Sequence, residues 1–221
     1  MTAEDKRKLK ITTDELIDNL VVDNKPVTVL KDHRIRFIQW LLISTVSITI
    51  GLQLLGIRND IGIKLQDPLF IIESFIIVFT AVLATSAAFT LSIPGLERSK
   101  SQKYGVYITL GLWFLITIIK IINSDLDLQQ GLVGFSCITD TITLGIMPGI
   151  LLFYMLRKAA SVRLGLSGAM AFLGTLALAG IGIRFSCSFE HPVHLLIGHI
   201  LPILTLGIVG IFIGKITLHW D

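Results

Sequence analysis

The sequence predicts an all-α integral membrane protein with six transmembrane helices, both termini in the cytoplasm, and a short amphipathic helix ahead of the first span. Hydrophobic residues make up 52% of the 221-residue chain and charged residues only 16%, against roughly 25% charged in an average soluble domain. The apolar residues are gathered into six long runs. Lysine and arginine are unevenly divided between the segments that join these runs, which sets the orientation.

Each apolar run is long enough to cross a bilayer as a helix, because about 20 residues rising about 1.5 Å each span a hydrocarbon core of about 30 Å. The predicted spans are 35–57, 69–93, 104–122, 137–156, 164–185 and 193–217. Together they form a transmembrane domain, 35–217, preceded by a polar segment, 1–34, and followed by a short cytoplasmic tail, 218–221.

The distribution of positive charge predicts that the N-terminus is cytoplasmic. Of the 19 lysines and arginines, 15 fall in segments on the same side as residues 1–34, and four fall on the opposite side. Positive residues favour the cytoplasmic side, and six spans return the C-terminus to it. The polar start of the chain also predicts no cleavable signal peptide.

The segment 1–34 contains a predicted helix over residues 11–23. Thr12 and Glu15 have the spacing of a capping box, and an apolar stripe follows them. Pro26 then ends the helix. So short a helix is marginal in water unless its apolar face is covered. The residues predicted to make that contact are Thr13, Asp14, Leu16, Ile17, Leu20, Val21 and Pro26. The acidic residues beside the stripe favour a basic protein groove over anionic lipid, and packing on the membrane or on cytoplasmic loops stays open.

Two cysteines and several ionisable groups are predicted to gather at the outer membrane face. Cys137 begins the fourth span, and Cys187 follows the fifth with three histidines within thirteen residues. Ionisable residues within spans face the bundle interior and indicate function. Thiolate and imidazole suit zinc, cadmium or copper. The candidate site residues are Cys137, Cys187, His191, His194, His199, Glu73 and Asp140. No obligatory cofactor is expected, and zinc or cadmium is the candidate metal.

Three roles for the cysteine pair are consistent with the sequence. In the first role, the pair would sense metal ions or oxidants. In the second, it would form a permanent disulfide in the oxidising compartment, provided that the two Cα atoms lie within about 7 Å of each other. In the third, the two cysteines would be inert buried thiols. If the pair is a sensor, a change in its state would alter helix packing and so the cytoplasmic docking platform.

Composition and motifs exclude several functional classes. The pI of 8.9 does not indicate a nucleic-acid surface. A CxxC pair, a Ser/His/Asp set and an HExxH motif are all missing from the sequence, so we expect no enzymatic activity. An inner-membrane transporter of small solutes or metal ions is the main alternative, although internal repeats and midplane charges are not evident.

Several short motifs resemble one family along nearly the whole chain. They are TTDELIDNL at 12–20, the Pro26–Val27 pair, an arginine ahead of the first span, LSIPG at 91–95, both cysteines, His199 and the closing Trp220. In these features the chain resembles the membrane-embedded anti-sigma factors of the negative-regulator-of-sigma-F (NrsF) type. It departs from the expected pattern at Gly198, where an aromatic residue would precede the histidine.

The resemblance implies a bacterial inner-membrane protein that holds an extracytoplasmic-function sigma factor through residues 1–34 and releases it under stress. It also implies that Cys137 and Cys187 take part in sensing heavy metals or oxidants.

Overall fold

The computed structural model describes residues 12–22, 30–96, 101–124, 135–159 and 161–219, all of them helical or irregular. The chain divides into two compact units, residues 1–30 and 31–221. The first contains α2 (Thr13–Val22). The helices of the second are α3 (His33–Leu55), α4 (Ile61–Lys64), α5 (Pro68–Leu91), α6 (Ser101–Ile122), α8 (Phe135–Arg157), α9 (Leu164–Ser186), α10 (Pro192–His194), the π-helix η1 (Leu195–Ile200) and α11 (Leu201–Thr217).

The six predicted spans are confirmed as helices, with ends that agree within three residues. All six are long and apolar enough to cross a membrane, and α10, η1 and α11 together make the sixth. Large apolar side chains such as Leu54, Phe75 and Phe212 are exposed on the bundle surface, as contact with lipid requires.

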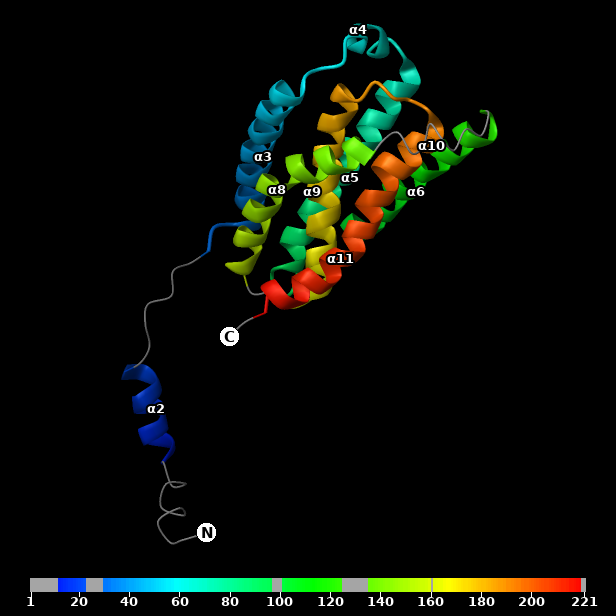
Figure 1. Ribbon diagram of the computed structural model, residues 1–221. Helices are drawn as coiled ribbons and strands as arrows, with labels where there is room; N and C mark the ends of the chain where they lie inside the picture. Colours follow the sequence, from blue (N-terminus) through cyan, green and yellow to red (C-terminus); the bar gives the residue numbers. More distant parts are fainter. Residues whose placement is uncertain (1–11, 23–29, 97–100, 125–134, 160, 220–221) are drawn as a thin grey trace. The chain divides into compact units, whose positions relative to one another are not determined.

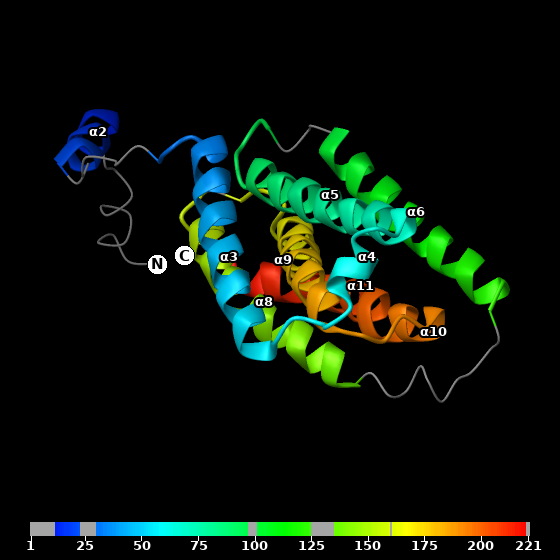
Figure 2. The same ribbon diagram turned by 90° about the horizontal axis from the view of Figure 1, so that it is seen from above.

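Helix α9 is the centre of the bundle. It contacts α3, α5, α8 and α11, and Figures 1 and 2 show these helices on different sides of it. Most of its residues are buried, many of them Gly or Ala. Small side chains permit the close approach that membrane helices use in place of a hydrophobic driving force.

Glycine fixes the crossing of α9 and α11. A Cβ atom on Gly168 would lie 2.2 Å from the carbonyl oxygen of Gly210, and one on Gly214 would lie 2.5 Å from that of Leu164. Neither position therefore accepts a larger residue without separating the helices. This contact holds the sixth span against α9, the helix that leads to Cys187.

Helix α3 packs on the bundle through one stripe of residues four apart: Arg36, Trp40, Ser44 and Ile48. The Trp40 side chain is fully buried, and its Nε1 donates a hydrogen bond to the Pro148 carbonyl of α8 at 2.9 Å. The first span is thus tied to the helix that carries Cys137.

The capping box of α2 is confirmed. The Thr12 amide donates to Glu15 Oε2 at 3.0 Å, and the Glu15 amide donates to Thr12 Oγ1 at 3.3 Å. The reciprocal bonds satisfy two amides that the first turn would leave unpaired.

The same bonds make α2 sensitive to acid. Hydrogen bonds from Thr12 hold the pKa of Glu15 below its ordinary value of 4.5. A carboxylate with a lowered pKa stabilises the helix above its ordinary pKa, and that stabilisation disappears as the pH falls through the lowered value. The circular dichroism of a peptide of residues 10–24 should therefore lose helical signal on acidification. The Glu15→Gln peptide should lose less helical signal on acidification than the parent peptide. Identical pH profiles for the two peptides would show that Glu15 does not stabilise the helix.

Candidate functional site

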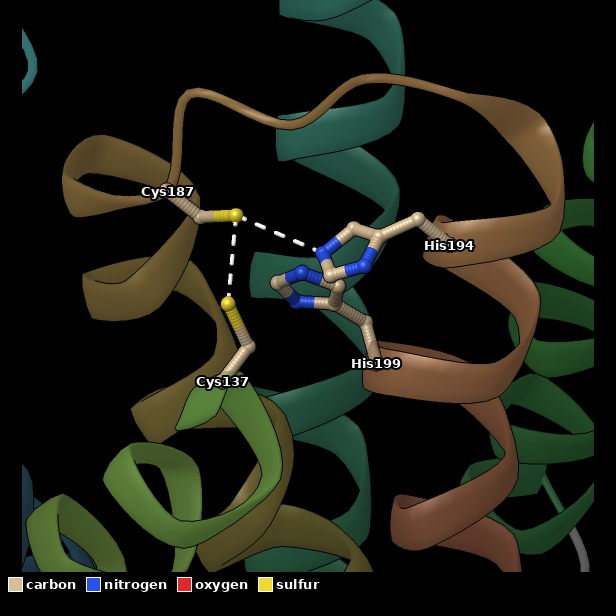
Figure 3. A group of neighbouring side chains, drawn as sticks. All are labelled: Cys137, Cys187, His194 and His199. Atoms are coloured by element: carbon tan, nitrogen blue, oxygen red, sulfur yellow. Dashed lines mark hydrogen bonds between the residues drawn. The ribbon is translucent and has the colours of Figure 1, made fainter. Parts of the chain in front are cut away.

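Four side chains with soft or borderline donor atoms converge at the far end of the bundle, meaning the end away from His33. They come from three segments: Cys137 from the first turn of α8, Cys187 from the residue after α9, and His194 and His199 from α10 and η1. One donor atom from each lies within 4.8 Å of all the others. Figure 3 shows the four side chains pointing toward one another.

The two sulfurs of this cluster lie close together. Cys137 Sγ and Cys187 Sγ are 3.2 Å apart, and both residues are free thiols. Cys187 Sγ also lies 3.4 Å from His194 Nε2. The cluster can therefore form a disulfide or present thiolates to a metal ion after only small movements.

Burial leaves the cluster one exposed edge. Cys137 and His199 are buried and His194 is fully buried, whereas Cys187 is half-buried. Cys187 ends α9 through the bond of its amide to the Ile183 carbonyl and then adopts an extended conformation. The loop from 187 to 191 is thus the least buried side of the cluster.

Three of the seven predicted site residues lie outside this cluster. His191 is the residue before α10. Asp140 is half-buried in α8, one turn beyond Cys137. Glu73 is fully buried in α5 but pairs with cations. The structure therefore brings together the two cysteines with His194 and His199, and not the carboxylates.

Glu73 is the centre of an ion cluster that joins three helices. Its Oε1 lies 2.5 Å from Lys120 Nζ of α6, and its Oε2 lies 2.5 Å from Arg184 Nη2 of α9. The Arg184 guanidinium also lies 4.3 Å from the Phe70 ring centroid and donates from Nε to Ser74 Oγ. A buried carboxylate is stable only when paired in this way. The sequence pattern did not identify Lys120 and Arg184 as its partners.

Arg58 straps the loop after α3 to the loop that carries Cys187. Its Nη1 donates to the Cys187 carbonyl at 2.9 Å and to Glu190 Oε1 at 2.8 Å, and its Nε donates to Asp60 at 2.6 Å. The Asp60 hydrogen bond raises the pKa of Arg58, and the Arg58 hydrogen bond lowers the pKa of Asp60. Lys64 pairs with Glu190 as well. Arg58 therefore keeps its charge and fixes the backbone at Cys187.

Removing this strap should expose Cys187. Arg58→Met removes the donor of Asp60 and of the Cys187 carbonyl and leaves Glu190 only its pair with Lys64. The loop should therefore open more often, and Cys187 should be alkylated about tenfold faster. The rate is measured with a maleimide in a Cys137→Ser background. Lys64→Met is the matched control, because Lys64 pairs with Glu190 but has no bond to Cys187. Equal rates for Arg58→Met and the parent protein would contradict the role given to Arg58.

The predicted docking residues of α2 are available for contact. Leu16 and Ile17 are about half exposed, Val21 is 64% exposed, and Thr13 and Asp14 are also exposed. The side chain of Leu20 and the whole of Pro26 lie outside the described residues.

Fold and site together define a membrane protein whose described residues include six helices long enough to span a bilayer, with a thiol and imidazole cluster at one end of the bundle. The sequence model of NrsF, negative regulator of sigma F, matches residues 20–220. The chain belongs to this family and is accordingly a negative regulator of a sigma factor. Searches of curated proteins and of solved structures found no significant match.

Proposed function

We propose that this protein is an anti-sigma factor of the bacterial inner membrane, with both termini in the cytoplasm. It holds an extracytoplasmic-function sigma factor through residues 1–34 and releases it when the outer-face cysteine and histidine cluster meets metal or oxidative stress. The sensing part of the proposal is supported by one observation: two free thiols and two imidazoles from distant parts of the chain converge in one cluster.

The exposed apolar face of α2 supports the docking part of the proposal. Leu16, Ile17 and Val21 have no cover among the described residues of their own unit, which extends from 1 to 30. An isolated ten-residue helix is marginal in water. A sigma-factor groove would supply the missing apolar contact, while Asp14 and Asp18 would meet basic residues at its rim.

The sulfur geometry supports an oxidative input. Hydrogen peroxide would accept two electrons and two protons from the thiols of Cys137 and Cys187, giving a disulfide and two waters. The sulfurs must approach from 3.2 Å to a bond length of about 2.05 Å. That movement draws the start of α8 toward the end of α9. A metal ion would act on the same two helices through metal–sulfur bonds.

Helix α3 is the element best placed to carry the change to the sigma factor. The residues after its end are strapped to the Cys187 loop by Arg58, and Trp40 bonds to the helix of Cys137. Its first residue, His33, lies at the end of the docking segment 1–34. Movement of α8 against α9 would therefore shift α3, and we assign the switch to these two contacts.

Co-purification from membranes tests the docking role. The full chain should retain a sigma factor, and a chain lacking residues 1–30 should lose it while its bundle remains folded, because that bundle is a separate compact unit. An unchanged set of bound proteins after the deletion would refute the proposal. A transporter of solutes or metal ions would give that unchanged set.

A further inference from the structure

We infer that Cys137, Cys187, His194 and His199 form a closed four-ligand site for one divalent d10 cation, zinc or cadmium. The assignment of His194 and His199 as ligands stands on the geometry of the sixth span. Only its consequence, that occupancy governs sigma release, rests on the proposed function.

The π-helix η1 is what places both histidines on one side of the sixth span. In an α-helix, five residues turn through about 500°, so His194 and His199 would lie about 140° apart around the axis. A π-helix closes bonds between residues five apart, as the Leu201 amide does to the Leu196 carbonyl here. Residues five apart then lie nearly above one another. The two imidazole centroids are accordingly only 5.2 Å apart.

Two neighbouring residues explain this local geometry. Pro202 lacks an amide proton, and in an α-helix its ring would clash with the carbonyl four residues earlier, at Gly198. A π-turn is one way in which a membrane helix accommodates such a proline. Gly198 also leaves room for the His194 ring, because a Cβ atom there would lie 3.1 Å from His194 Cε1. The departure from the family pattern at Gly198 therefore coincides with a histidine packed against it.

The donor atoms are nearly at the separations that tetrahedral coordination requires. Metal–sulfur bonds of about 2.3 Å and metal–nitrogen bonds of about 2.0 Å place tetrahedral donors about 3.3 to 3.8 Å apart. The two sulfurs are 3.2 Å apart, Cys187 Sγ and His194 Nε2 are 3.4 Å apart, and no pair exceeds 4.8 Å. Side-chain adjustments of about 1 Å complete the site.

The charge of the four donor groups also favours a divalent ion. A divalent ion would displace one proton from each thiol and bind two thiolates and two neutral imidazoles. The resulting centre is electrically neutral, which suits its burial. With no oxygen donor in the set, zinc and cadmium are favoured over magnesium and calcium.

Metal titration of the purified full chain in lipid nanodiscs, under reducing conditions, tests the ligand set. Cadmium binding is followed by the ultraviolet thiolate-to-metal band, and cobalt by its visible bands, which report tetrahedral geometry. We expect one ion per chain and tetrahedral cobalt. His194→Ala and His199→Ala should each weaken cadmium binding by at least about 100-fold. His191→Ala is the matched control from the same region and should bind as the parent does.

The outcomes separate this inference from the proposed function. Undiminished binding in both histidine variants, octahedral cobalt, or no binding by the parent protein would overturn the four-ligand site. Sigma-factor capture is measured on the same preparations. Capture without metal binding would overturn the inference and leave the anti-sigma role standing. One tetrahedral ion per chain without capture would support the inference and refute the proposed function.

Discussion

Replacing Leu16 and Ile17 with aspartate should weaken sigma-factor binding by at least about 100-fold. Fully burying one such side chain stabilises a contact by about 1.5–3 kcal/mol, and a few apolar anchors supply most of the affinity of a helix in a groove. Both side chains are about half exposed in α2, so no packing within the bundle should be lost. Binding is measured with purified sigma factor and the full chain in nanodiscs.

Val22 provides a matched control on the same helix. Its side chain is 86% exposed and lies on the opposite side from the apolar stripe, given about 100° per residue. Val22→Asp should therefore bind nearly as well as the parent protein. If it weakened binding as much as the paired change, the loss would reflect added negative charge, and the stripe would not be the docking face.

Replacing both Cys137 and Cys187 with serine should leave the sigma factor bound but abolish its release. The parent protein should change its sigma affinity by roughly 5- to 150-fold on oxidation or metal loading, the range of a typical coupling between two sites. Serine is nearly the size of cysteine, but it does not form a disulfide and is a poor ligand for soft metals. Reporter transcription under cadmium or peroxide stress measures the response in cells.

A single cysteine variant tests the oxidative input. Cys137→Ser alone retains Cys187 beside His194 but removes any internal disulfide, so the response to peroxide should disappear. A double variant that still released the sigma factor normally would show that the cysteine pair is not the sensor. Protein abundance in the membrane must be equal across the variants, because lower abundance would also release the sigma factor.

Most of the fold was predictable because lipid imposes simple rules. Long apolar runs have to become helices in a bilayer, and the capping box at Thr12 and Glu15 is a local pattern that requires no tertiary information. That Cys137 and Cys187 lie at the same end of the bundle also followed from topology, because one begins the fourth span and the other follows the fifth.

Other parts of the site depended on contacts that spacing alone does not reveal. Pro192 interrupts the stretch that holds the histidines, so helical spacing could not be used to predict which of them lie together. The π-helix brings His194 together with His199, whereas the i,i+3 spacing had suggested His191 with His194. Glu73 was predicted as a candidate ligand, but Arg184 comes from a helix more than 100 residues away and pairs with it. In the sequence, Arg58 was used only as a charge that sets the orientation, although its side chain donates to the Cys187 carbonyl.

The most direct test of the coupling between the cluster and the sigma factor is the sigma-factor affinity of one nanodisc preparation in three states. These are reduced and metal-free, cadmium-loaded, and oxidised, with occupancy and disulfide content measured on each sample. The proposed coupling predicts that affinity falls at least about fivefold in the loaded or the oxidised state. Equal affinity in all three states, at full occupancy and full oxidation, would contradict it.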